Sequence, residues 1–148
     1  MFVSDLPLPP LLVELLETRR WKSPRDVGRL AEVAGFKNPH RLDFMKPDGM
    51  QRETNALIAL YEQGFGETYG LLRSADGEIA PDDPSWVDVR LVIVLANNWD
   101  EEGLCLDYRP GLHQPRVLAG AWPEDEDMPM LWRVIARDFP AFVELLRF

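Results

Sequence analysis

Two groups of acidic residues are the densest chemistry-bearing features of the sequence. They are Asp100, Glu101 and Glu102, directly before Gly103, and Glu124, Asp125, Glu126 and Asp127. Paired carboxylates can act as acid and base, but only where mutual burial or a metal separates their pKa values. Adjacent residues on a turn point in different directions, so a solvated turn is the favoured interpretation of the first group.

The second acidic run, residues 124–127, raises the question of a metal site. Metal binding requires oxygen ligands arranged in a cage, and the spacing here is not that of an EF-hand loop. His40, His113 and Cys105 are the only histidines and the only cysteine, and they show no repeated ligand spacing. Zinc is therefore not expected. We expect no metal and no cofactor, and a solvated loop at residues 124–127.

Cys105 and Asp107 lie on one strand-like segment and raise the question of catalysis. A nucleophilic cysteine needs a neighbouring base and an electropositive site, and the sequence shows no triad-like pattern. A cysteine in a strand is usually a small core residue. Asp107 could pair with Arg116 on the next strand or with Arg109 nearby, which is a structural role. We therefore expect no catalytic residues.

The elements that must position these residues begin with helices. Apolar residues recur at helical spacing in three segments, which are residues 9–21, 23–36 and 51–63. Ser23 and Pro24 resemble a helix cap, and Gly35 resembles a helix end. The intervening residues 37–50 look irregular.

Strands dominate the second half of the chain. We expect one at residues 91–96, whose continuous apolar run is typical of a strand buried on both faces. Further strands are expected at 103–108, 115–122 and 131–136, with another candidate at 67–73 before a turn at Ala75-Asp76-Gly77. A closing helix is expected from Phe139, with Asp138 as its N-cap. This order predicts a single α+β domain over residues 1–148, helical to about residue 64. Its antiparallel sheet should hold about four to six strands, flanked by the N-terminal helices and closed by the C-terminal helix.

Charge is distributed unevenly along the chain. The net charge of −9 comes entirely from residues 75–148, because acidic and basic residues balance in residues 1–74. This argues against direct nucleic-acid binding and favours a basic protein partner that the electric field would steer. The alternative is that the charge only keeps the protein in solution. No apolar stretch is long enough to span a membrane, and the lone cysteine fits a reducing compartment, so we expect a cytoplasmic protein without membrane contact.

Three features of the second half occur together and in order. They are an apolar strand followed by a polar loop and Leu106-Asp107-Tyr108, then Pro115-Arg116-Val117, and finally Trp132-x-x-Ile135-Ala136-x-x-Phe139-x-x-Phe142-x-x-Leu145-Leu146. In combination they resemble the SUKH superfamily, and more narrowly its Smi/Knr-type family of bacterial immunity proteins and fungal cell-wall-assembly regulators. The N-terminal half is a weaker match.

The resemblance implies an antiparallel sheet flanked by helices, and binding as the common activity. Many bacterial members are thought to neutralise toxins of neighbouring polymorphic toxin systems, often nucleases. The family carries no shared catalytic residues. This sequence departs from it at residues 98–102, which are bulkier and more acidic than the Gly-rich loop of many relatives. The departure marks either a partner-specific surface or drift.

We therefore expect a non-enzymatic immunity protein that occludes a basic toxin, such as a nuclease, in a stoichiometric complex. The alternative is a housekeeping scaffold or regulatory interaction domain of the Smi/Knr type without a toxin partner. The candidate binding residues are Trp99, Asp100, Glu101, Glu102, Glu124, Asp125, Glu126 and Asp127. Trp99 would be an aromatic anchor, although it could equally cover the core. Reversing the charge of the acids at 100–102 should slow association without unfolding the protein.

Overall fold

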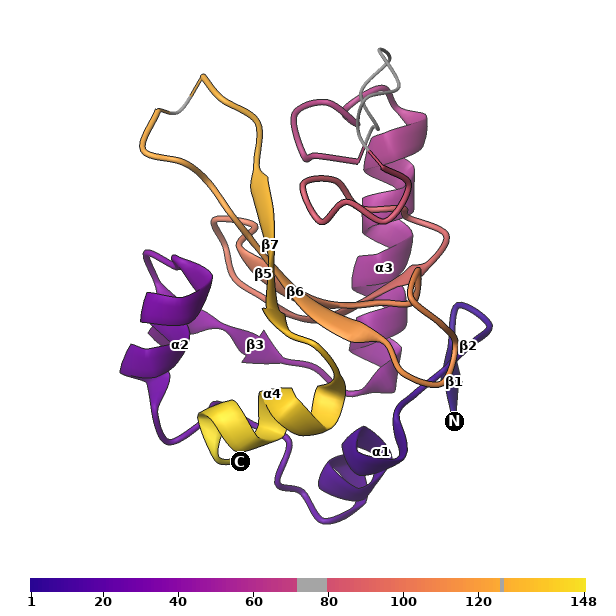
Figure 1. The fold of residues 1–148 in the computed structure, drawn as a ribbon, viewed down its shortest axis with the longest axis vertical. Helices are drawn as coiled ribbons and strands as arrows, with labels where there is room; N and C mark the ends of the chain where they lie inside the picture. The colour runs from indigo at the N-terminus through magenta and orange to yellow at the C-terminus, as the bar shows by residue number, and fades with distance from the viewer. Residues whose placement is uncertain (72–79, 126) are drawn as a thin grey trace.

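The computed structural model describes residues 1–71, 80–125 and 127–148 (Figure 1). The helices are α1 (Pro10–Glu17), α2 (Val27–Ala34), the short 3-10 helix η1 (Pro39–Arg41), α3 (Pro47–Glu62) and α4 (Phe139–Leu146). The strands are β1 (Phe2–Val3), β2 (Leu6–Pro7), β3 (Asp43–Phe44), β4 (Val92–Asn97), β5 (Gly103–Asp107), β6 (Arg116–Ala121) and β7 (Leu131–Ala136). Strands β3 to β7 form one antiparallel sheet in chain order, and β1 pairs with β2 separately. The predicted α+β fold with a closing helix is confirmed.

Helices cover both faces of the sheet, as Figure 1 shows, with α3 on one side and α1, α2 and α4 on the other. Every residue of β5 is buried, and β4 is buried from Val92 to Ala96. This two-sided burial explains why the sequence of β4 is a continuous apolar run rather than an alternating one. Strands β4 and β5 are therefore packed on both faces and hold the ends of their connections in place.

An aromatic cluster fills the space on the α4 side of the sheet. Its members are Trp21, Phe44, Phe139, Phe142 and Phe148, with neighbouring ring centroids 5.0 to 6.5 Å apart. The Trp21 indole is 7% exposed, and its Nε1–H donates to the backbone oxygen of Met45 at 3.0 Å. These ring contacts, together with the burial of the large rings, hold α4 in place against the sheet.

Two predicted helix starts are wrong. Helix α2 begins at Val27, because the side chain of Asp26, not Ser23, accepts the backbone N–H of Arg29 at 2.9 Å. Helix α3 begins at Pro47, within the segment expected to be irregular, since proline suits the first helical position. The ends at Gly35, with φ of 74°, and the Asp138 cap of α4 are confirmed.

The predicted strand at residues 67–73 is wrong in its described part. Residues 67–70 form turns and Leu71 has no regular structure, and residues 72–73 and the predicted turn at 75–77 lie outside the described residues. Gly70 has φ of 66°, which lies outside the range of regular strands, and its oxygen accepts the N–H of Val87 at 2.8 Å. The N-terminal half also contributes to the sheet, because β3 pairs with β4 at one edge.

Gly120 leaves room for the indole of Trp132 on the neighbouring strand. A Cβ atom at position 120 would lie 2.7 to 2.8 Å from three carbons of that ring. The ring is 7% exposed, and its Nε1–H donates to the oxygen of Tyr69 at 2.8 Å, so it cannot move without losing a hydrogen bond. Gly120→Ala is expected to destabilise the protein by about 1–3 kcal/mol in urea unfolding.

The matched control for this substitution is Gly28→Ala in α2. A Cβ atom at Gly28 would meet no atom closer than 3.9 Å, and alanine has a higher helix propensity than glycine. The control should therefore leave the free energy of unfolding unchanged or raise it. A Gly120→Ala variant as stable as the unsubstituted protein would show that the Trp132 contact is not tight.

Candidate functional site

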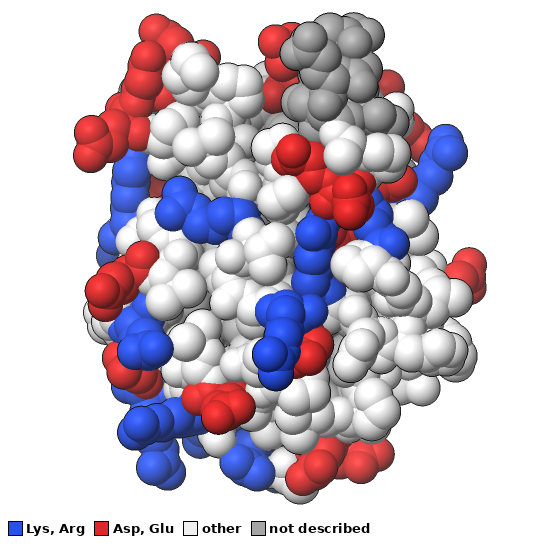
Figure 2. Space-filling model, in the orientation of Figure 1, with Lys and Arg blue, Asp and Glu red and all other residues white. Residues whose placement is uncertain are grey.

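The topology brings the two acidic segments to the same end of the sheet. In an antiparallel sheet in chain order, the β4–β5 and β6–β7 connections lie at one end, and these connections hold residues 98–102 and 122–130. Trp122 joins them, because its Nε1–H donates to the oxygen of Asp100 at 2.6 Å. Figure 2 shows acidic side chains at the tip of the β6–β7 loop, at the upper left. Glu126 lies outside the described residues.

Trp99 stands at this end of the sheet with its side chain in solvent. It is 93% exposed, the largest value among the large apolar side chains of the described residues. The alternative that Trp99 covers the core is therefore excluded. A hollow of about 250 Å³ lies beside it, and its lining residues are Arg41, Asp43, Glu53, Asn97, Asn98 and Trp99 itself.

The turn that carries Trp99 is fixed by hydrogen bonds to Asn98. The Asn98 side-chain oxygen accepts the N–H groups of Asp100 at 3.0 Å and Glu102 at 3.1 Å. The backbone oxygen of Asn98 accepts the N–H of Glu101 at 3.0 Å, and Glu101 has φ of 62°. A non-glycine residue in this left-handed region is held there by its surroundings. The backbone of the turn that carries Trp99 is therefore held in one conformation.

Glu102 does not belong to the exposed surface, and its predicted place there is wrong. Its side chain is fully buried, and its carboxylate accepts the N–H groups of Lys37, at 2.9 and 3.2 Å, and of Asn38, at 3.2 Å. The Asn98 side-chain amide donates a further bond at 3.0 Å. The physical reason is that the loop after α2 offers two backbone donors that need an acceptor. Glu102 ties that loop to the Trp99 turn.

The other described acids of the candidate set are exposed. They are Asp100, Glu101, Glu124, Asp125 and Asp127. The Asp100 carboxylate accepts a hydrogen bond from the side-chain amide of Asn38. The hydrogen bond and charge of Glu101, together with burial, raise the pKa of the Tyr69 hydroxyl to about 12. The exposed carboxylates and Trp99 all lie at this end of the sheet, and together they are called here the Trp99 face.

A cavity of about 120 Å³ opens beside the Trp99 face, between α3 and the sheet. Its lining residues are Glu53, Ala56, Leu57, Leu60, Tyr69, Val94, Asn97, Glu101, Gly103, Cys105, Met130 and Trp132. Sequence reasoning missed this cavity, because its walls come from one helix, three strands and three loops. The only local feature that pointed to this region was the combination of Trp99 with acidic residues in the turn at residues 98–102.

Cys105 lies in the wall of this cavity and is 1% exposed. Burial, and then the charge of Asp107, raises the pKa of its thiol well above the ordinary value. A nucleophilic thiol requires the opposite shift. Neither His40 nor His113 lines the cavity. The arrangement suits a small core residue, as the sequence predicts.

Asp107 pairs with both arginines that the sequence offered. Its carboxylate accepts Arg109 Nε at 2.9 and 3.1 Å and Arg116 Nε at 2.7 Å. Arg109 also donates to the backbone oxygens of Pro81 at 3.2 Å, Asp83 at 3.1 Å and Trp86 at 2.7 Å. The network fastens the segment before β4 to the sheet. The predicted structural role of Asp107 is confirmed.

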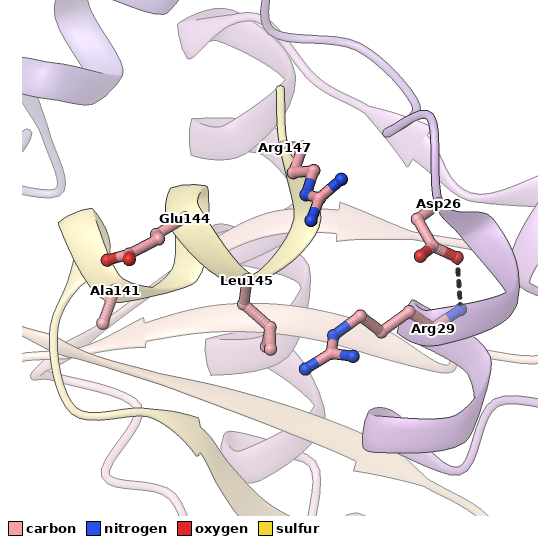
Figure 3. Close-up of a pocket in the computed structure, with 6 residues that line it drawn as sticks. All are labelled: Asp26, Arg29, Ala141, Glu144, Leu145 and Arg147. Atoms are coloured by element: carbon pink, nitrogen blue, oxygen red, sulfur yellow. Dashed lines mark hydrogen bonds between the residues drawn. The ribbon is translucent and has the colours of Figure 1, made fainter.

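A second cleft, of about 460 Å³, lies between α2 and α4 (Figure 3). Its lining residues are Asp26, Arg29, Ala141, Glu144, Leu145 and Arg147. Figure 3 shows two guanidinium groups, that of Arg29 in α2 and that of Arg147 directly after α4, directed toward the space between the helices. Both arginines are exposed, and two acids balance their charge. Charge therefore favours neither an anion nor a cation, and we assign the cleft no role.

Within residues 1–71, 80–125 and 127–148, no three His, Cys, Asp or Glu side chains are grouped as metal ligands would be. Among the described helices, none combines the length and the apolar character that crossing a membrane requires. No family model matches the chain, and no curated protein or solved structure matches it. Membership of the SUKH superfamily stays a prediction from the motifs quoted above.

Proposed function

We propose that this protein is a non-enzymatic binding module that recognises a basic protein through the Trp99 face. The observation that carries the proposal is the 93% exposure of Trp99 on a turn whose backbone is fixed from within. A tryptophan held in water contributes nothing to the core. Buried in a partner, it would supply a large apolar anchor on a backbone that is already ordered, so that binding restricts mainly its side chain.

Charge supports a basic partner. Asp100 and Glu101 follow Trp99 directly, and three further exposed acids lie at the same end of the sheet in the β6–β7 loop. A surface with an excess of negative charge raises the association rate for a positively charged protein and makes that rate sensitive to salt. The acids would then stand in for the phosphates that a nuclease normally contacts.

The resemblance to Smi/Knr-type proteins supports the specific form of this proposal. It favours a cytoplasmic immunity protein that occludes a cognate toxin of a polymorphic toxin system. The alternative is a scaffold or regulatory domain without a toxin partner. Leu131 and Val134, which are 47% and 41% exposed on the edge strand β7, favour that alternative, because a scaffold would use an apolar surface of this kind.

Trp99→Ala is expected to weaken partner binding by at least about 2 kcal/mol, or roughly thirtyfold, and to leave stability within about 0.5 kcal/mol. The measurement is affinity capture from a lysate of the source organism at low and high salt, with mass spectrometry of the retained proteins. The captured partner is then titrated against each variant by calorimetry.

The control for this experiment is Phe2→Ala, which removes a 68% exposed aromatic from β1. It should leave capture unchanged. A stoichiometric basic partner, lost at high salt and lost with Trp99→Ala, would support the immunity proposal. Retention that is indifferent to salt and to Trp99 would contradict it and favour the scaffold alternative.

A further inference from the structure

We propose that the cavity between α3 and the sheet receives a lysine side chain of the bound partner. The inference rests on the proposed function, because it assumes that a basic protein covers the Trp99 face. It assigns to that partner a specific residue type at a specific place. Size, lining, charge and position of the cavity each bear on it.

The walls of the cavity suit an aliphatic chain. Val94, Cys105, Met130 and Trp132 are 1% to 7% exposed and form its inner part. Ala56 and Glu101 are exposed, so the cavity leads from solvent to the sheet. An apolar chain that enters would exchange water for contact with these walls, which is favourable in proportion to the area buried.

The charged groups of the cavity are carboxylates. Among its described lining residues, Glu53 and Glu101 carry charge, and none is Lys, Arg or His. One Glu53 oxygen accepts the side-chain amide of Asn97 at 3.0 Å. The other meets Arg52 at 3.3 Å, in a pair whose arginine side chain is 69% exposed and which is therefore weak. A cation entering the cavity would find acceptors already positioned.

The size of the cavity selects a single side chain. About 120 Å³ is below the roughly 300 Å³ at which pockets for drug-sized ligands begin. It is close to the roughly 150 Å³ of an engineered apolar cavity that holds one benzene molecule. Lysine combines a four-carbon stem with a compact ammonium group, whereas arginine carries a broad planar head that requires two parallel hydrogen bonds. Lysine is therefore the better match.

The position of the cavity links it to the Trp99 face. Glu53 and Asn97 line both this cavity and the hollow beside Trp99. Glu101 belongs to the same turn as Trp99. A partner that contacts Trp99 would therefore also lie over the mouth of the cavity, and one of its lysines could enter without further rearrangement.

The test uses the isolated protein and N-acetyl-lysine amide as the probe. Methyl NMR signals of Leu57, Val94 and Met130 are followed during titration at millimolar concentrations. We expect saturable shifts of these signals. N-acetyl-norleucine amide, which has an aliphatic stem without the charge, should bind about threefold to fivefold more weakly, as a partly exposed ion pair predicts. Equal or tighter binding of norleucine amide or of N-acetyl-arginine amide would overturn the choice of lysine.

Two substitutions on α3 locate the binding. Ala56→Leu places a larger side chain at the exposed mouth of the cavity and should abolish the saturable shifts. Ala59→Leu is the matched control, because residue 59 lies on the same helix but does not line the cavity. Glu101→Gln should weaken lysine amide binding and leave norleucine amide unaffected. Absence of saturable shifts, or equal effects of the two leucine substitutions, would overturn the inference.

The failure of this inference can be told apart from a failure of the proposed function. The probe titration uses no partner, and Trp99→Ala should leave it unchanged because Trp99 does not line the cavity. If partner capture depends on Trp99 but is unaffected by Ala56→Leu, the cavity inference is wrong and the proposed function stands. If the probe binds but no basic partner is captured, the proposed function is wrong.

Discussion

Asp107→Asn is expected to lower the free energy of unfolding by about 3–5 kcal/mol. The side chain of Asp107 is 2% exposed and that of Arg109 is 5% exposed, and the carboxylate is the counter-charge of both Arg109 and Arg116. Asparagine keeps the volume but removes the charge, which leaves a buried guanidinium without compensation. Because Arg109 also holds the backbone at Pro81, Asp83 and Trp86, this segment should loosen from the sheet.

Urea unfolding of the two proteins, followed by tryptophan fluorescence, measures this effect. The control is Asp82→Asn, since Asp82 is exposed and only its backbone oxygen contacts Arg116. Its stability should stay within about 0.5 kcal/mol of the unsubstituted protein. If Asp107→Asn lowers the free energy of unfolding by less than about 1 kcal/mol, water or other groups replace the carboxylate. The network would then not be what holds the segment before β4 to the sheet.

Glu102→Gln is expected to destabilise the protein by about 2–4 kcal/mol, because hydrogen bonds to a charged group are stronger than neutral ones. The carboxylate accepts the backbone N–H groups of Lys37 and Asn38 and the side-chain amide of Asn98. A glutamine side chain has only one acceptor oxygen. Its NH₂ group would face the N–H donors that now bind the second carboxylate oxygen. The loop after α2 should therefore separate from the Trp99 turn.

Urea unfolding gives the loss of stability, and amide hydrogen exchange at Lys37 and Asn38 shows where it arises. Glu101→Gln is the matched control, one residue away and exposed, and it should change neither quantity by much. Equal stability of the two variants, with both amides still protected, would refute the role of Glu102. The result also bears on charge reversal at positions 100–102, because a lysine at 102 would unfold the loop rather than test the surface.

The sequence was informative wherever a local pattern has one physical meaning. The apolar run of β4 predicted burial on both faces, and Leu131–Ala136 was predicted with the bounds that the structure has. Asp138 before Phe139 and Pro140 predicted the cap of α4. In these cases the outcome depends on residues within a few positions, so periodicity and capping chemistry were sufficient.

The sequence was misleading where two local patterns compete. Ser23 and Asp26 both suit the N-cap position of a helix. In the structure Asp26 occupies that position. Residues 67–70 belong to a segment of strand-like composition, yet they form turns in which the oxygens of Thr68 and Gly70 accept hydrogen bonds from Met130 and Val87. Propensity is weak beside such long-range bonds. The short strand β3 needed the edge of β4 as its partner, and nothing in its own residues indicated that.

Residue patterns alone predicted the α+β order of elements, the central strands, the pairing options of Asp107 and the presence of two acidic loops. Contacts between distant segments leave Glu101 in solvent and bury Glu102, although the two are adjacent and chemically alike. These contacts also leave Trp99 exposed and a cavity beside it. The physical reason is that burial depends on partners some sixty residues away, such as Lys37 for Glu102, and no local pattern carries that distance.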